Sequence, residues 1–248
     1  MSTFLTAEWR KLIMAQYAID PALLAPYLPP GIELDLYQDA ATPAARPTCF
    51  VSLVGFLFTR VRLKRIAIPF HTHFEEVNLR FYVRRQEPDG THKRGVVFIR
   101  EFVPRAAIAF VAKRFYEEPY TAIPTHHRIN LSTESLDIHY SWDCGGQSHS
   151  LSVTASPTPQ PIQPNSEEDF ITEHYWGYTK RSDATTSAYQ VEHPSWQTYP
   201  IRNATLDADF GLLYGPTFAH LNHQQPTSIL LAEGSPVTVH TGSRLPAA

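Results

Sequence analysis

The segment 74–83 alternates between polar and apolar residues from Glu76 onward, and it constrains the fold more than any other part of the chain. Successive side chains of an extended strand point to opposite faces, so this alternation predicts a β-strand with one apolar face. The other face carries a carboxylate, an amide, a guanidinium and a phenol, from Glu76, Asn78, Arg80 and Tyr82. On an open sheet this polar face would meet water, whereas in a closed or strongly curved sheet it would line a cavity. The segment therefore predicts either a solvated strand or a ligand site.

The composition favours one β-rich domain that spans residues 1–248. Hydrophobic residues make up 43% of the chain and charged residues 18%, which suits a folded chain with a sizeable core. The chain contains 21 prolines and 12% aromatic residues, and it lacks long runs of strong helix formers. That mixture favours short strands and loops over long helices. We therefore predict a mainly β fold with a few short helices.

Charge and cysteine content exclude several classes of protein. The net charge of -3 lacks the basic surplus of a nucleic-acid-binding protein. The longest apolar run, residues 50–58, is interrupted by Ser52 and Gly55 and is too short to cross a bilayer. Cys49 and Cys144 have no paired spacing, and charged residues interrupt the N-terminus where a secretory leader would be apolar. We expect a cytoplasmic protein with neither a nucleic-acid nor a membrane partner. The sequence leaves open whether the protein forms a homo-oligomer.

Start and stop signals predict the remaining elements. Asp20 followed by Pro21 suits the start of a short helix over 21–28, and a Pro-Pro-Gly sequence ends it. A Pro-Asp-Gly turn at 88–90 predicts a hairpin between the strand 74–83 and a partner at 95–103. Helical spacing appears at 106–116 and after Ser166. Further strands are predicted at 32–37, 49–58, 135–142, 148–155, 175–179, 188–192, 228–232 and 236–240.

The register of the predicted hairpin decides which residue joins the polar face. Directly opposed residues of an antiparallel pair point to the same side. Depending on the register, either Arg100 or Glu101 therefore shares the face of Glu76 and Arg80. The sequence leaves both alternatives open.

Glu76 and Arg80 are the strongest candidates for chemistry. Two residues four apart on one strand lie roughly 13 Å apart along it, too far for a direct ion pair. That separation suits the two ends of a small polar ligand, with Arg80 binding a carboxylate and Glu76 near the reacting carbon. The alternative is an amphipathic strand whose charged residues lie in water.

Histidines offer a rival site. His71 and His73 share a face in an extended chain, but Glu76 would lie on the opposite face of a regular strand, so we expect no metal and no cofactor. His193 precedes a proline, which favours an extended backbone that could aim its imidazole inward. A structural histidine beside Trp196 is the other interpretation. A nucleophile elbow and a glycine-rich phosphate loop are both missing from the sequence, which disfavours hydrolase and nucleotide chemistry.

Short motifs along nearly the whole chain resemble those of a known family. They are Asp20-Pro21-Ala22-Leu23-Leu24, Leu28-Pro29-Pro30-Gly31, Val51-Ser52-Leu53-Val54, the strand 74–83, Gly95-Val96-Val97-Phe98, Pro119-Tyr120, Ile171-Thr172-Glu173-His174-Tyr175, His193-Pro194-Ser195-Trp196 and Leu231-Ala232-Glu233-Gly234-Ser235. In their order and coverage they are similar to the YqjF-like family of bacterial proteins of unknown function, which is related in fold to acetoacetate decarboxylase. The resemblance implies an antiparallel, barrel-like acetoacetate decarboxylase-like fold. It also implies that the polar face of the strand 74–83 points into the barrel.

The resemblance also bears on the reaction. In acetoacetate decarboxylases a lysine that follows a Gly-x-Pro turn forms a Schiff base with a β-keto acid. Here the similar position after Pro119 holds Tyr120, and a phenol cannot form an imine. We therefore expect the barrel to hold a small polar or carbonyl-bearing ligand, such as a keto or enol acid, with any proton-transfer or lyase chemistry proceeding without a Schiff base.

These expectations assign roles to seven residues. The catalytic candidates are Glu76, Arg80 and Tyr120, with Tyr120 donating a hydrogen bond to a carbonyl or enolate oxygen. The binding candidates are Asn78, Tyr82, Glu101 and His193. Two alternatives remain: a non-catalytic small-molecule binding or sensor protein that uses the same pocket, and a metal-dependent barrel enzyme that uses His71 and His73.

Overall fold

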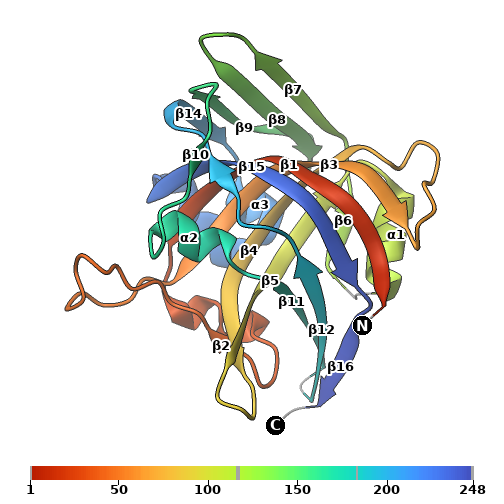
Figure 1. The fold of residues 1–248 in the computed structure, drawn as a ribbon, viewed down its shortest axis with the longest axis vertical. Helices are drawn as coiled ribbons and strands as arrows, with labels where there is room; N and C mark the ends of the chain where they lie inside the picture. The colour runs from red at the N-terminus through yellow and green to blue at the C-terminus, as the bar shows by residue number, and fades with distance from the viewer. Residues whose placement is uncertain (1, 116–117, 183, 247–248) are drawn as a thin grey trace.

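A curved β-sheet closes on itself in the computed structural model of the protein, which describes residues 2–115, 118–182 and 184–246 (Figure 1). The barrel strands are β1 (Thr3–Ala18), β3 (Phe50–Leu63), β4 (Phe74–Gln86), β5 (His92–Val103), β11 (Trp176–Ser182), β12 (Thr185–Glu192) and β15 (Ser228–His240). They pair in the order β15, β1, β3, β4, β5, β11 and β12, and β12 then pairs with β15, with Val191 opposite Val239. Only β5 and β11 run parallel within this ring. The predicted mainly β, barrel-like fold is confirmed.

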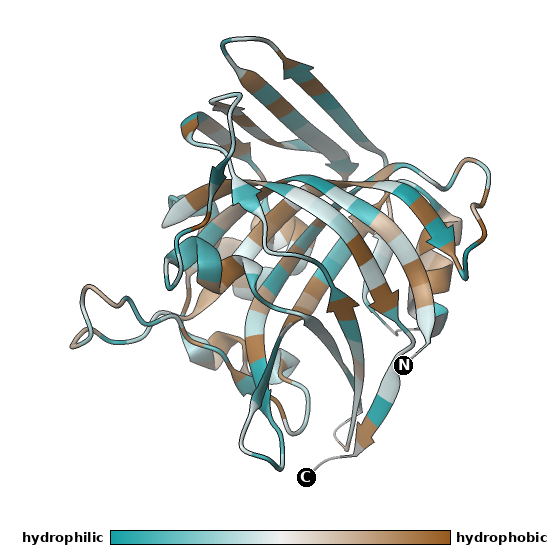
Figure 2. Cartoon of the chain, viewed as in Figure 1, coloured by the Kyte–Doolittle hydropathy of each residue, from teal (hydrophilic) through white to brown (hydrophobic). Residues whose placement is uncertain are grey.

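A second sheet lies against one end of the barrel (Figure 1). Its strands are β7 (Thr125–Leu131), β8 (Leu136–Cys144), β9 (Gln147–Ala155) and β14 (Ile201–Asp207), in the order β14, β9, β8 and β7. Alternate residues of β8, such as Tyr140 and Trp142, are buried in the same apolar core as Phe81 and Phe102 of the barrel. The two sheets therefore share one core. Figure 2 shows hydrophobic and hydrophilic residues alternating along many of these strands, as strands with two different faces require.

Short helices and strands complete the chain. The helices are the 3-10 turns η1 (Pro21–Leu23), η2 (Ala25–Tyr27) and η3 (Pro216–His223) and the α-helices α1 (Ala106–Phe115), α2 (Glu167–Thr172) and α3 (Phe210–Tyr214). The short strands are β2 (Glu33–Leu34), β6 (Tyr120–Ala122), β10 (Gln160–Pro161), β13 (Gln197–Thr198) and β16 (Ser243–Pro246). Within the part of the chain that the structure describes, no helix has the length and apolar character needed to cross a membrane.

Two predicted helix starts have the expected caps. The carboxylate of Asp20 accepts a hydrogen bond from the backbone N–H of Ala22, and the hydroxyl of Ser166 accepts one from Asp169. The predicted helix over 21–28 is instead two 3-10 turns, because Pro26 cannot donate a backbone hydrogen bond within it.

Several elements differ from the sequence-based expectations. β1, β7, β14 and α3 were not predicted, and the two strands expected at 228–232 and 236–240 are one strand, β15. Gly234 has a left-handed backbone (φ 77°) in the middle of β15, which explains why the alternation changes phase there.

The polar face of β4 points into the barrel and is almost fully shielded from solvent. Glu76 and Asn78 are 2% and 1% exposed, so the solvated-strand alternative is wrong. Asn78 lies opposite Glu101 in the β4–β5 pair, whereas Arg100 lies opposite Leu79 and therefore points to the other side. The Arg100 guanidinium donates to the carbonyl oxygen of Leu213 at 2.7 Å. Glu101 is thus the residue that joins the polar face.

Candidate functional site

A cavity of about 230 Å³ lies inside the barrel, and every barrel strand contributes to its lining. Glu76, Asn78 and Arg80 line it from β4, and Phe98 and Glu101 line it from β5. Phe98 and Glu101 are three residues apart, a spacing that a regular strand would send to opposite faces. The register shift between Leu79 and Arg80 accounts for this, because a bulge re-aims the residues that follow it.

Glu76 is held by two hydrogen bonds. Its Oε1 accepts from the side-chain amide of Asn78 at 2.9 Å, and its Oε2 accepts from the hydroxyl of Tyr120 at 2.8 Å. Tyr120 reaches this position because β6 runs beside β5, with Tyr120 opposite Glu101. Burial raises the pKa of Glu76 to about 7, although both hydrogen bonds oppose the rise. Glu76 can therefore gain or lose a proton near neutral pH.

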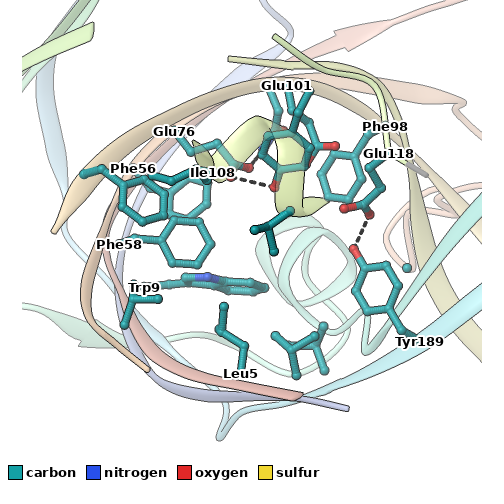
Figure 3. A pocket seen from close by; sticks show the side chains of 18 of the residues that line it. Leu5, Trp9, Phe56, Phe58, Glu76, Phe98, Glu101, Ile108, Glu118 and Tyr189 are labelled. Atoms are coloured by element: carbon teal, nitrogen blue, oxygen red, sulfur yellow. Dashed lines mark hydrogen bonds between the residues drawn. The ribbon is translucent and has the colours of Figure 1, made fainter. Parts of the chain in front are cut away.

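Two further carboxyl groups lie close to Glu76. Burial raises the pKa of Glu118 to about 8, although its carboxylate accepts a hydrogen bond from the hydroxyl of Tyr189 (Figure 3). Burial also raises the pKa of Glu101 well above its usual range, and the neighbouring charges of Glu118 and Glu76 raise it further. Three buried carboxylates with one nearby guanidinium would leave uncompensated charge. Protonation of the cluster removes this charge.

Arg80 is a buried cation in the wall of the cavity. It is 9% exposed, and no carboxylate of the described residues lies within ion-pair distance of its guanidinium. One of its amino groups contacts the sulfur of Met14 at 3.7 Å, and the guanidinium lies 5.7 Å from the centre of the Tyr82 ring. Its Nε has no hydrogen-bond partner in the described part of the chain. Arg80 thus keeps hydrogen-bonding capacity for an anion.

His174 also lines the cavity and is neutral. Burial is the main reason that the pKa of His174 falls to about 4. Its Nε2 lies 3.1 Å from the Asp35 carboxylate, which also accepts from Arg94 at 2.6 Å. Burial alone would raise the pKa of Asp35, but these two hydrogen bonds outweigh it and lower the pKa. The ionised Asp35 therefore fixes the proton of His174 on Nε2.

The opposite side of the cavity is apolar. Trp9 meets Phe56 and Phe58 edge to face at 5.7 and 6.0 Å between ring centres, and Phe58 stacks on Phe74 at 4.8 Å. Figure 3 shows Glu101 and Glu118 on one side of the cavity and Trp9 with Phe58 on the other. A ligand that fills the cavity would therefore meet polar groups at one end and aromatic rings at the other.

Gly177 makes room for Tyr189. The two residues are directly opposite in the β11–β12 pair, and a Cβ atom on Gly177 would lie 2.2 Å from the Tyr189 ring. No side chain fits in that space, so glycine at this position allows the Tyr189 hydroxyl to reach Glu118.

Two predicted binding residues do not line the cavity. The hydroxyl of Tyr82 bonds to that of Ser52 at 2.7 Å, and its ring packs against Phe170. His193 is partly buried and stacks on Trp196 at 4.5 Å between ring centres. This position matches the structural interpretation of His193.

The histidines of the rival metal site are not brought together with other ligands. His71 lines the cavity, but its Nδ1 donates to the carbonyl oxygen of Pro69 at 2.8 Å, and His73 is exposed. Among the residues that the structure describes, no group of three or more His, Cys, Asp or Glu side chains is placed to hold a metal ion.

Sequence reasoning missed Glu118, Tyr189 and His174 as cavity residues. Glu118 lies two positions before Tyr120, a spacing that places both on one face of an extended segment and could have identified it. Tyr189 reaches the site only because the barrel closes, so the local sequence around Tyr189 could not predict its position.

The chain matches the DUF2071 family, described as an uncharacterized conserved protein (COG2071), over residues 6–236. It therefore belongs to this family. The search of curated proteins found no match.

Solved structures with a similar fold include an acetoacetate decarboxylase and an acetoacetate decarboxylase-like enzyme. The enduracididine biosynthesis enzyme MppR with bound HEPES buffer has a TM-score of 0.65 at 12% identity, covering 100% of this chain and 89% of that one. Acetoacetate decarboxylase from Legionella pneumophila has a TM-score of 0.62 at 13% identity, and the match covers 98% of this chain and 88% of that one. An acetoacetate decarboxylase-like enzyme from Sphingomonas wittichii RW1 has a TM-score of 0.64 at 10% identity, with 100% and 95% covered. The chain thus has an acetoacetate decarboxylase-like fold, as the resemblance of its sequence motifs implied.

Proposed function

We propose that the protein binds a small carbonyl-bearing carboxylic acid in the barrel cavity and moves a proton at the carbon next to the carbonyl group. The observation that carries this proposal is Glu76, a buried carboxyl group in the cavity wall whose pKa is about 7. A general base works best when its pKa lies near the working pH. Two hydrogen bonds fix its orientation.

Arg80 would bind the carboxylate of the ligand. A guanidinium binds a carboxylate through two parallel hydrogen bonds, which fixes both position and direction. Arg80 is buried and has no ion-pair partner among the described carboxylates, so an anionic ligand would supply the missing charge. This placement would orient the rest of the ligand along the cavity.

Proton transfer would then involve the acidic cluster. Glu76 takes a proton from the carbon next to the carbonyl: the C–H bond breaks, an O–H bond forms, and the electron pair moves to the carbonyl oxygen. A carboxyl group that an apolar site keeps protonated can donate a hydrogen bond to such an oxygen. Glu101 and Glu118 meet this condition, because burial raises the pKa of each. This assigns oxygen stabilisation to these two groups, with Tyr120 serving to hold Glu76.

One observation supports chemistry without an imine, and another supports a keto acid as the ligand. None of the described residues that line the cavity is a lysine, and the side chain of Lys113 lies outside the described part of the structure. A structure of MppR, which has a similar fold, contains pyruvate. A 2-keto acid is therefore a reasonable first probe for this cavity.

Proton exchange tests the proposal. We would incubate the protein with 4-methyl-2-oxopentanoate in D₂O and follow the loss of the C3 proton signal by NMR. We expect exchange above the buffer rate for the wild type and at the buffer rate for Glu76→Gln. Glu75→Gln is the matched control, because Glu75 points away from the cavity and bonds to Thr125. Exchange that survives Glu76→Gln would refute the role of Glu76, and binding without exchange would favour the non-catalytic alternative.

Borohydride tests the missing Schiff base. Reduction in the presence of a β-keto acid traps an imine as a stable adduct that mass spectrometry detects. We expect no adduct on the protein, because Tyr120 follows Pro119 where the decarboxylases have a lysine. An adduct on Lys113 would show that decarboxylase-like chemistry operates here.

A further inference from the structure

The apolar wall of the cavity suggests which acids the site takes. Proton transfer needs only the polar end, yet Trp9, Phe56, Phe58 and Phe74 also line the cavity. The Phe58–Phe74 pair lies two residues further along β3 and β4 than the Phe56–Glu76 pair. Phe56, Phe58 and Phe74 are each less than 9% exposed. Rings packed in this way present a fixed apolar surface, which gains free energy when hydrocarbon covers it.

The volume of the cavity exceeds what the smallest keto acids fill. A dry cavity of about 150 Å³ holds benzene, with six non-hydrogen atoms. By the same proportion, 230 Å³ holds roughly nine such atoms. Pyruvate has six, so it would leave part of the aromatic wall uncovered.

The apolar lining continues to the opening of the cavity. Ala107 of α1 is exposed and lines the cavity, as does Ile68, which is 41% exposed. Ile108 of the same helix is half-buried and lies between the acidic groups and Leu5 in Figure 3. Arg80, Glu76, Glu101 and Glu118 are at most 9% exposed, whereas Ala107 and Ile68 are exposed, so the carboxylate of a ligand would lie inside the cavity and its hydrocarbon part would extend towards α1.

We propose that the ligand is a keto acid with a branched or unbranched hydrocarbon tail, bound in preference to pyruvate. This inference rests on the proposed function, because it assumes that the carboxylate binds Arg80. The tail covers the wall formed by Trp9 and Phe58 and ends near Ala107 and Ile68.

A chain-length series tests the proposal. Calorimetry would measure the affinity of unbranched 2-keto acids from pyruvate to 2-oxooctanoate. Each added methylene should improve affinity about fourfold until the cavity is full. Ala107→Trp places a bulky ring at the opening and should reduce the gain for the longest acids. Ala106→Trp is the matched control, because Ala106 is exposed on the same helix but does not line the cavity, and it should leave the series unchanged.

The series separates this inference from the proposed function. Affinity that does not change with chain length would overturn the inference, even if pyruvate undergoes proton exchange. Affinity that rises with chain length, in the absence of proton exchange for any acid, would uphold the ligand class and refute the proposed reaction. Equal effects of Ala107→Trp and Ala106→Trp would show that the tail does not extend towards α1.

Discussion

The acidic residues of the cavity can be understood from the free energy of buried charge. A carboxylate moved out of water is unfavourable unless a cation or several hydrogen bonds compensate it. Glu76 has two hydrogen-bond donors and Glu118 has one, whereas neither oxygen of Glu101 has a partner in the described part of the chain. This order agrees with the pKa values. The pKa of Glu76 is raised least, and the pKa of Glu101 is raised well above its usual range. Glu76 is therefore the member of the cluster that ionises most readily.

The stability of the protein should fall as pH rises. The pKa of Glu118 is about 8 in the folded protein against an ordinary value of 4.5, so between these pH values the folded state binds more protons than the unfolded state. The stabilisation is complete below about pH 4.5 and is lost as pH rises to about 8. We expect urea denaturation from about pH 5 to about pH 9 to show that the free energy of unfolding decreases. Glu118→Gln should make this decrease smaller. Glu134→Gln, at an exposed site, should leave it unchanged. Identical pH dependence in all three proteins would contradict the buried-cluster account.

Removal of the Tyr120 hydroxyl should change the ionisation of Glu76. That hydroxyl donates to the carboxylate and lowers its pKa, so Tyr120→Phe should move the proton-exchange profile to higher pH. A hydrogen bond of this kind contributes about 0.5–1.5 kcal/mol, which corresponds to at most about a tenfold change in rate at neutral pH. The measurement is the NMR exchange rate as a function of pH, with Tyr27→Phe as a control outside the cavity lining. An unshifted profile would show that the Tyr120 hydroxyl does not influence the ionisation of Glu76.

At the scale of elements, β4 was predictable and β1 was not. The alternation of β4 is local, so its start and its two faces can be read from the segment 74–83, although the strand continues to Gln86. β1 contains Glu8, Arg10 and Lys11, whose charges pair with one another or with Glu233 on the neighbouring β15. Lys11 also has a left-handed backbone (φ 57°), and the register shifts between Arg10 and Ile13. Long-range pairing thus compensates charges that look unfavourable for a buried strand in the sequence.

The β11–β12 pair offers a test at this scale. Gly177→Ala would force the Tyr189 ring away, because the added Cβ would lie 2.2 Å from it. We expect a loss of about 1–3 kcal/mol in the free energy of unfolding, together with weaker keto-acid binding. Thr179→Ala on the same strand is the control, since Thr179 lies outside the cavity lining. Urea denaturation measures the first effect and calorimetry the second. Stability and affinity that match the control would show that Tyr189 has another way to reach Glu118.

At the scale of the whole molecule, closure of the barrel decides which residues meet. The sequence predicted Glu76, Asn78 and Arg80 on one polar face and left open whether Arg100 or Glu101 joins them. In the structure Glu101 joins them, and all four line the cavity together with Tyr120. The contributions of Tyr189 and His174 depend on segments far from β4 in the chain, so local patterns could not predict them, whereas the spacing of Glu118 from Tyr120 could have identified Glu118. Tyr82 follows the alternation of β4 but lies beyond the cavity, because α2 and its neighbour His174 cover it.

The shared core should make the two sheets unfold together. Tyr140 of the small sheet packs against Gly55 of the barrel, with a ring atom 3.1 Å from where a Cβ would lie. We therefore propose that residues 1–248 form one domain and expect one transition in thermal unfolding. Far-ultraviolet circular dichroism and tryptophan fluorescence should report the same midpoint. Two separate midpoints would indicate that the small sheet is an independent unit.

The central claim is that the barrel cavity binds a keto acid between Arg80 and the aromatic wall, with Glu76 beside the reacting carbon. A crystal structure of the protein soaked with 4-methyl-2-oxopentanoate tests it most directly. The account predicts that the ligand carboxylate lies on the Arg80 guanidinium, that its C3 atom lies within about 3–3.5 Å of the Glu76 carboxyl group, and that its tail contacts Phe58 and Trp9. An empty cavity at saturating ligand, or a ligand bound with its carboxylate away from Arg80, would contradict the account.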